Sequence, residues 1–439
     1  MRDDPRLPSA PAFWRSPLRG PWFTSVLGLV LLVGITVLFV TGLLSYAAYN
    51  PDLAPVNDKT PDKGILGFYL FAWPTNPHWL YRLNQGVHVT LGITLIPVLL
   101  AKLWSVVPRL FALPPARSLA HALERISLLL LVGGALFEFV TGVLNVQLEY
   151  VFPGSFYPLH FYGAWVFFAA FAVHAALKTP AALRNLRNLR NLRDLRDLRE
   201  GNSRGLRRTR KPVPETAAPA AEPDTLVSPR PDTPTVSRRG ALAFVGGGSL
   251  LLFLTTAGQS ADGLLRRTAL LAPHGGPDPG TGPNGFQINK TARYAGIRTA
   301  QTSREAWRLV VTGRTGSVRL SRDDLLRLPL HSASLPIACV EGWSTSDQWW
   351  RGVRLRDLAA LVGHDDPPDV FVESLQRRGA FRHAALRANQ VADPRSLLAL
   401  YVNGEELSPD HGHPARVIVP AAPGVLNTKW VARMTFGDL

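Results

Sequence analysis

Long stretches without a charged side chain constrain this chain more than any other feature of its sequence. Each stretch has roughly the 17–25 residues that a membrane-spanning helix needs, a length rarely left uncharged in the core of a soluble protein. One stretch contains a single acid, Glu138, and the others contain no charged residue. We therefore predict five transmembrane helices, four close together and one after a long gap, within residues 20–51, 83–101, 126–148, 150–177 and 240–261.

Basic residues orient these helices, because Lys and Arg accumulate on the cytoplasmic side of a membrane. Several Arg and Lys residues precede the first helix and lie between the second and the third, whereas residues 147–158 contain none. This pattern predicts a multi-pass protein of the cell membrane with a cytoplasmic N-terminus. Residues 1–178 then form a four-helix transmembrane bundle that is surrounded by membrane lipid.

Residues 179–239 have a different composition, rich in Arg, Pro and Ala, and begin with a Leu-Arg-Asn repeat. Residues 178–239 contain 15 basic and 7 acidic side chains. Their net charge of +8 is half of the formal net charge of +16. We interpret this segment as a cytoplasmic linker whose repeat continues the fourth helix as a basic stem. Its charge either fixes the topology or binds anionic lipid head groups. Because the charge is concentrated there, we expect no nucleic-acid partner.

The fifth helix, residues 240–261, is expected to anchor a final domain, residues 262–439. Ser237-Arg238-Arg239 precedes it and resembles a twin-arginine export signal, although two arginines also make an ordinary basic flank. Either interpretation places the final domain outside the cytoplasm. Short β-like runs at 307–311, 370–372 and 417–419 alternate there with helical stretches such as 355–362, which predicts an α+β fold.

The chain has one cysteine, which excludes a disulfide framework, a Cys-based zinc site and a Cys-ligated iron–sulfur cluster. It stands in Leu335-Pro-Ile-Ala-Cys339-Val-Glu-Gly-Trp343, which is followed by Trp350-Arg-Gly352. Further motifs are Asn284-Gly-Phe-Gln-Ile288, Val402-Asn-Gly-Glu405, His411-Gly-His-Pro-Ala-Arg416 and Lys429-Trp430. Together, over residues 283–436, they resemble the sulfite oxidase/methionine sulfoxide reductase family of molybdenum enzymes.

The resemblance implies a sulfite-oxidase fold that holds a molybdopterin cofactor, with Cys339 as catalytic residue and molybdenum ligand. A thiolate suits this role because it is a soft, strongly donating ligand, whereas a lone Cys without the motif is usually a small buried residue. His411 and Ser374 stand where the bacterial reductases of the family have Asn and Thr. The implied pterin contacts are Asn284, Gln287, Ile288, Ser374, His411, Arg416, Asn427, Thr428 and Lys429.

Two histidines in the predicted bundle, His88 and His160, lie at a similar depth near its outer side. Two such imidazoles are candidate axial ligands for a b-type haem iron, as in a cytochrome b; the alternative is a helix-packing hydrogen bond. The residue 14 positions after His88 is Lys102, so a second pair with His174 is incomplete and the haem count stays open. Glu138 is a candidate proton or quinone group, or else makes a buried structural hydrogen bond to a neighbouring helix.

These observations predict a membrane-anchored molybdenum oxidoreductase that transfers an oxygen atom to or from a small sulfur compound. Electrons would be exchanged through the cytochrome b-like bundle with quinone or with a redox partner protein. Arg351, Arg377, Arg378 and His383 either line an anion-binding pocket for such a substrate or lie on the surface. The alternative function is a membrane-tethered binding or structural module that has kept the sulfite-oxidase fold without its chemistry.

Overall fold

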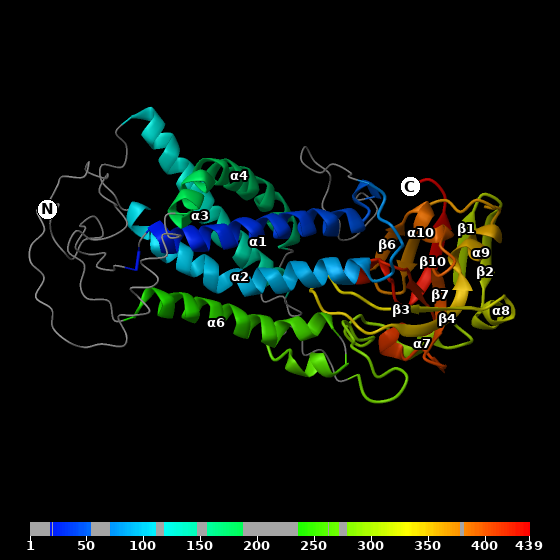
Figure 1. Ribbon diagram of the computed structural model, residues 1–439. Helices are drawn as coiled ribbons and strands as arrows, with labels where there is room; N and C mark the ends of the chain where they lie inside the picture. Colours follow the sequence, from blue (N-terminus) through cyan, green and yellow to red (C-terminus); the bar gives the residue numbers. More distant parts are fainter. Residues whose placement is uncertain are drawn as a thin grey trace, which may run out of the picture. The chain divides into compact units, whose positions relative to one another are not determined.

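The computed structural model describes residues 18–19, 21–53, 71–110, 118–146, 156–187, 236–261, 263–271, 279–377 and 382–439 (Figure 1). The chain divides into two compact units. One unit comprises Met1–Thr36, Thr94–Phe139 and Gly163–Leu251, and the other comprises Val37–Ile93, Val140–Tyr162 and Leu252–Leu439. This division differs from the domain boundaries expected from the sequence, because parts of the first four helices belong to the same unit as the C-terminal domain.

The five helices predicted from the uncharged stretches are confirmed as helices. Each contains a segment that is long and apolar enough to cross a membrane, although the bundle and the membrane itself stay predictions. The helices are α1 (Pro21–Ala48), α2 (Leu80–Leu110), α3 (Leu119–Asn145), α4 (Tyr157–Arg187) and α6 (Arg238–Thr256). Helix α4 continues through Pro180 to Arg187, so the first part of the Leu-Arg-Asn repeat is helical. The remainder of the linker, residues 188–235, lies outside the described residues.

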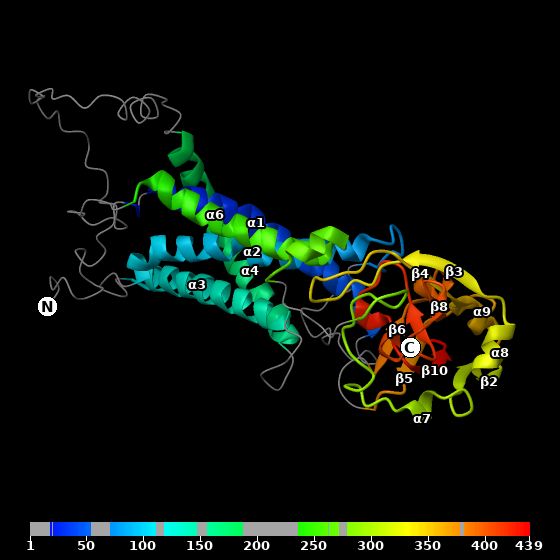
Figure 2. The ribbon, with the colours of Figure 1, turned by 90° about the horizontal axis from the view of Figure 1, so that it is seen from below.

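The C-terminal domain contains two five-stranded sheets (Figures 1 and 2). The first has the strand order β2-β1-β10-β5-β6, in which only β1 and β10 are parallel. Its strands are β1 (Leu309–Gly313), β2 (Gly316–Leu320), β5 (Val370–Ser374), β6 (His383–Leu386) and β10 (Val431–Phe436). The second has the order β3-β4-β7-β8, and β9 pairs with β7. Its strands are β3 (His331–Leu335), β4 (Gln348–Arg354), β7 (Leu397–Val402), β8 (Glu405–Glu406) and β9 (Arg416–Ile418).

Apolar alternation explains these sheets. In β1, Leu309 and Val311 are fully buried and the residue between them is half-buried, as expected for a strand with one face in the core. Strand β7 is apolar and buried along almost its whole length, as a central strand requires. The three predicted strands and the predicted helix are confirmed. The short helix α7 (Thr299–Thr302) precedes β1. Three more short helices connect strands: α8 (Arg322–Arg327), α9 (Leu355–Ala360) and α10 (Ala388–Ala392).

Residues from the N-terminal half complete this domain within the same compact unit. Asn50, just after α1, donates from Nδ2 to the carbonyl of Ala385 at 3.1 Å and to Oε1 of Gln390 at 2.9 Å. Trp73, before α2, donates from Nε1 to the carbonyl of Ala421 at 2.7 Å. Both donors are buried, so these bonds are shielded from water. No feature of the sequence indicates that residues so far apart would share one core.

Candidate molybdopterin site

The single cysteine lies in a tight loop between β3 and β4. The amide of Cys339 donates to the carbonyl of Trp343 at 2.8 Å, and the amide of Gly342 donates back to the carbonyl of Cys339 at 3.1 Å. Gly342 has a φ of 90°, which a residue with a Cβ rarely adopts, so glycine is needed for this turn. The loop presents a buried thiol at a defined point beside the second sheet.

The Cys339 thiol is held in its protonated form in the absence of a metal. Its Sγ donates to Oε2 of Glu341 at 2.9 Å, and the indole of Trp343 donates to the same oxygen at 2.9 Å. Burial, followed by the charge of Glu341, raises the pKa of the thiol well above its usual range. A metal that binds here must therefore displace a proton, as thiolate ligation generally requires.

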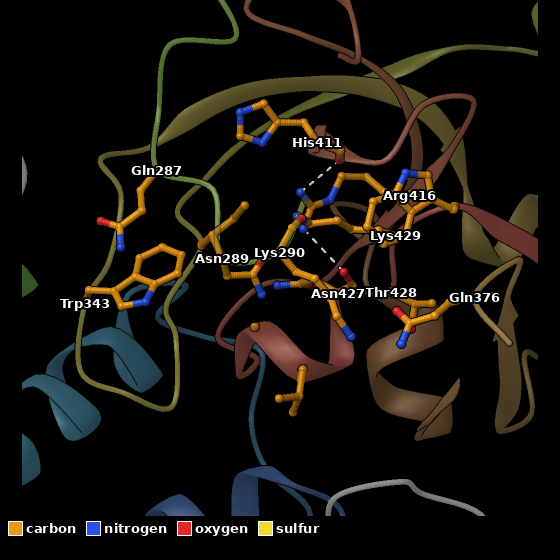
Figure 3. A pocket seen from close by; sticks show the side chains of 14 residues that line it. Gln287, Asn289, Lys290, Trp343, Gln376, His411, Arg416, Asn427, Thr428 and Lys429 are labelled. Atoms are coloured by element: carbon orange, nitrogen blue, oxygen red, sulfur yellow. Dashed lines mark hydrogen bonds between the residues drawn. The ribbon is translucent and has the colours of Figure 1, made fainter. Parts of the chain in front are cut away.

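One pocket gathers most of the predicted pterin contacts (Figure 3). It is lined by six of them: Gln287, His411, Arg416, Asn427, Thr428 and Lys429. The sequence interpretation missed the other lining residues, which are Asn289, Lys290, Ile337, Trp343, Gln376, Gly424, Val425 and Trp430. Ile337, Trp343 and Trp430 stand within the motifs, and Asn289 and Lys290 directly follow one, so their position in the chain was the available signal; Gln376 had none.

Two buried basic side chains, Arg416 and Lys429, line the pocket. Burial lowers the pKa of Arg416 to about 9, which leaves it charged at neutral pH. Burial, followed by the charge of Arg416, lowers the pKa of Lys429 well below its usual range. Arg416 donates to the carbonyls of His411 at 3.1 Å and Asn427 at 3.3 Å, while Lys429 donates to those of Lys290 at 2.9 Å and Asp410 at 2.8 Å. A buried phosphate would favour the charged form of both side chains.

Polar atoms in the pocket fit such a ligand. Within the described part of the chain, both amide atoms of Gln287, Nε of Arg416 and Nδ2 of Asn427 are buried without a hydrogen-bond partner. Buried polar atoms in native proteins are nearly always paired. These four atoms come from three pocket-lining residues, so one polar molecule in the pocket would satisfy them together. The residues present therefore fit a phosphorylated, hydrogen-bonding cofactor.

Three predicted contacts do not line this pocket but support residues that do. The backbone carbonyl of Asn284 accepts from Nε2 of His411 at 2.9 Å. The Asn284 side chain donates to the carbonyl of Glu406 at 3.0 Å and accepts from the amide of Ser408 at 2.9 Å. Ser374 donates from Oγ to the carbonyl of Lys429 at 2.7 Å. Ile288 is buried beside Gln287. Their roles as direct pterin contacts stay predictions.

His411 is neutral in this environment. Its ring stacks on Phe286 at a centroid distance of 3.8 Å. Burial, followed by the charges of Arg416 and Lys429, lowers its pKa to about 3. The ring thus supplies hydrogen-bonding capacity without adding a third positive charge.

Comparisons with known proteins match the same region. Residues 296–438 match the family model described as "Oxidoreductase molybdopterin binding domain". The C-terminal domain is thus similar to molybdopterin-binding oxidoreductase domains. Mouse mitochondrial sulfite oxidase is 34% identical over 156 residues, which cover 29% of this chain and 29% of that protein. The oxidoreductase YuiH of Bacillus subtilis is 30% identical over 131 residues, which cover 30% of this chain and 65% of that protein.

The match to mouse sulfite oxidase thus spans less than a third of that protein's length. Among solved structures, the sulfane dehydrogenase SoxCD from Paracoccus pantotrophus covers 31% of this chain and 39% of that chain, at 24% identity and a TM-score of 0.28. A TM-score this low does not support a conclusion about the C-terminal domain. The sequence match and the pocket geometry are independent observations that agree.

Metal ligation in the molybdopterin domain depends on the cofactor. Among the described residues, no group of three or more His, Cys, Asp or Glu side chains gathers in a way that could hold a metal ion. One thiolate alone is an incomplete ligand set, so molybdenum at Cys339 would take its remaining ligands from the cofactor and the substrate. Arg351 on β4 and His383 on β6 belong to different sheets, and Arg378 lies outside the described residues. The predicted anion pocket of these residues stays a prediction.

The two predicted haem ligands lie close together. The ring centroids of His88 and His160 are 6.3 Å apart, with an interplanar angle of 81°. With about 2 Å between a metal and an imidazole nitrogen, two rings on opposite sides of one metal have centres roughly 6 Å apart. The pair therefore has a spacing that fits two axial ligands.

Helix α2 also contacts the cysteine loop of the molybdopterin domain. Gln85 donates from Nε2 to the carbonyl of Val340, the residue after Cys339, and accepts from Ser45 at 2.8 Å. A Cβ at Gly342 would lie 2.7 Å from Cβ of Val89, so the loop and the helix are in direct contact. His88 lies between Gln85 and Val89 in the sequence. A short covalent and hydrogen-bonded path thus links the predicted haem ligand to the predicted molybdenum ligand.

Proposed function

We propose that this protein is a membrane-anchored molybdenum-cofactor oxidoreductase that catalyses two-electron oxygen-atom transfer on a small sulfur compound. In the reductive direction, a sulfoxide, two electrons and two protons yield a sulfide and water. In the oxidative direction, sulfite and water yield sulfate, two electrons and two protons. Molybdopterin would supply a metal that changes its oxidation state by two electrons.

One observation carries this proposal: the pocket that places buried Arg416 and Lys429 beside unpartnered amide atoms, next to the Cys339 loop. A pocket for an apolar ligand would not contain two desolvated basic side chains, because burying a charge without a counter-charge is costly. A phosphorylated cofactor explains both the charges and the unpaired atoms. The Cys339 thiolate would hold the metal, and Trp343 with Glu341 would fix the loop around it.

We further propose that electrons are exchanged through a b-type haem held by His88 and His160, with quinone or a redox partner protein beyond it. The spacing of the two rings supports this step. The contacts of Gln85 and Val89 with the cysteine loop support a route within one chain. A multi-pass location in the cell membrane, with the molybdopterin domain outside the cytoplasm, agrees with the five apolar helices and the distribution of basic residues.

The proposal is tested on the full chain purified in detergent. We expect about one molybdenum per chain by elemental analysis and a reduced-minus-oxidised optical spectrum with the α-band of a b-type haem. Cys339→Ala should abolish activity but retain the haem band, because the two sites use different residues. Chains without molybdenum from a host that makes molybdopterin would refute the enzymatic function. Molybdenum without a haem band would refute only the electron route.

A further inference from the structure

A segment of α1 is repeated in α3, and both copies lie against a predicted haem ligand. Phe39-Val-Thr-Gly42 and Phe139-Val-Thr-Gly142 have the same four residues. Thr41 Oγ1 lies 3.0 Å from Nδ1 of His88, and Thr141 Oγ1 lies 3.1 Å from Nδ1 of His160. We propose that Thr41 and Thr141 are positioning residues that fix the orientation and tautomer of the two histidines. The inference rests on the haem pair of the proposed function.

The repeat extends to the packing of each helix pair. Seven residues before each threonine is a glycine, Gly34 or Gly134. A Cβ at Gly34 would lie 2.5 Å from Leu95, which is seven residues after His88. A Cβ at Gly134 would lie 3.2 Å from Phe167, which is seven residues after His160. Because seven residues make about two helical turns, the two pairs of helices meet in the same register.

The glycine after each threonine makes room for the imidazole. A Cβ at Gly42 would lie 3.3 Å from Cε1 of His88, and a Cβ at Gly142 would lie 3.3 Å from Cε1 of His160. Either separation is tighter than ordinary van der Waals contact. Each Thr-Gly pair thus combines a hydrogen-bonding group with the space that the ring needs beside it.

Hydrogen-bond chemistry sets the tautomer of His88. The Thr41 hydroxyl has one proton, which it donates to the carbonyl of Val37 at 2.7 Å, as helical threonines often do. Its oxygen can then only accept from the ring, so Nδ1 of His88 carries the proton and Nε2 has the lone pair that ligates a metal. Metal-binding histidines generally donate their second ring N–H to such an acceptor, which also raises their basicity as ligands.

Isosteric variants of the full chain test the inference, read out by haem content, midpoint potential and low-temperature EPR. Thr41→Val and Thr141→Val remove the acceptor but keep the shape, whereas Thr41→Ser keeps the hydroxyl. Thr36→Val is the matched control, because Thr36 makes the same kind of bond, to Leu32 at 2.7 Å, on an exposed face of α1. Activity is not needed for any of these measurements.

Loss of an acceptor weakens electron donation to the iron and favours its reduced form. We expect each threonine-to-valine variant at the histidines to shift the reduced-to-oxidised ratio about tenfold, a rise of about 59 mV, or to lower haem affinity 10–100-fold. Thr41→Ser and Thr36→Val should match the parent in potential and EPR g-values. If one valine variant does not accumulate, the potential and g-values of the other valine variant test the inference.

Two results would overturn the inference. Parent-like potentials and g-values in both histidine-facing valine variants would show that the hydroxyls do not act on the ligands. Failure of both variants to accumulate, with Thr36→Val unaffected, would assign the threonines to packing alone. A parent chain that contains no haem would instead refute the electron route of the proposed function.

Discussion

Replacing Arg416 with methionine is expected to stabilise the cofactor-free protein while abolishing cofactor binding. Burial lowers the pKa of this guanidinium from 12.5 to about 9. At about 1.36 kcal/mol per pKa unit, keeping the charge in the pocket costs roughly 4–5 kcal/mol at neutral pH. A methionine of similar length fills the space without that cost.

The contacts that the substitution removes offset part of this gain. Arg416 donates to two carbonyls and lies 5.2 Å from the centre of the Trp350 ring. At about 1 kcal/mol for each of these three contacts, we expect a net stabilisation of about 1–2 kcal/mol. The advantage should shrink above about pH 9, because the parent Arg416 then loses its proton in the folded state and no longer carries the desolvation cost.

Arg322 provides the matched control. It is also buried but donates to Oε1 of Glu406 at 2.9 Å, so its charge is paired. Arg322→Met removes that ion pair, and because Glu406 is 55% exposed we expect a loss of only about 1 kcal/mol. The two substitutions should therefore change stability in opposite directions.

The assay is chemical denaturation of the full chain in detergent, produced in a host that cannot make molybdopterin and followed by tryptophan fluorescence. A second preparation from a host that makes the cofactor gives the molybdenum content of each variant. If cofactor-free Arg416→Met has a lower unfolding free energy than the cofactor-free parent, the reasoning is refuted. A parent-like molybdenum content in that variant would refute it too.

Three further predictions concern the cysteine loop and its neighbours. Cys339 is the only cysteine, so alkylation of the cofactor-free chain reports on it alone; the rate should rise with pH, and Glu341→Gln should move that rise to lower pH by removing the carboxylate that raises the thiol pKa. An unchanged pH profile would contradict this assignment. Trp73→Phe removes the donor to Ala421 and should lower the unfolding free energy by about 1–2 kcal/mol in denaturant titrations, whereas an unchanged midpoint would show that this bond contributes nothing. Gly342→Ala adds a Cβ at positive φ and 2.7 Å from helix α2, and should lower molybdenum content at least severalfold; full occupancy by elemental analysis would mean that the loop relaxes freely.

Local pattern was sufficient to predict the long helices and several strands. An uncharged stretch such as that of α1 can satisfy its backbone only as a helix in an apolar environment, so its helical state follows from composition. Strands such as β1 and β5 follow from runs of apolar residues with β-branched side chains. Pattern could not place Asn50 or Trp73, because their partners lie more than 300 residues away and nothing in local periodicity reports such a distance.

The sequence by itself also determined the chemistry: a single cysteine within an extended motif, cationic residues near the C-terminus and two histidines within apolar helices. Only the tertiary structure decided which of these residues meet. It brings Arg416 and Lys429 into one pocket, leaves Ser374 behind them as a support, and sets the ring centres of His88 and His160 6.3 Å apart. Residue type fixes what a side chain can bind or donate, whereas the separation between side chains depends on how distant segments pack. For this reason the repeated Thr-Gly pairs acquired a meaning only when each was found beside its histidine.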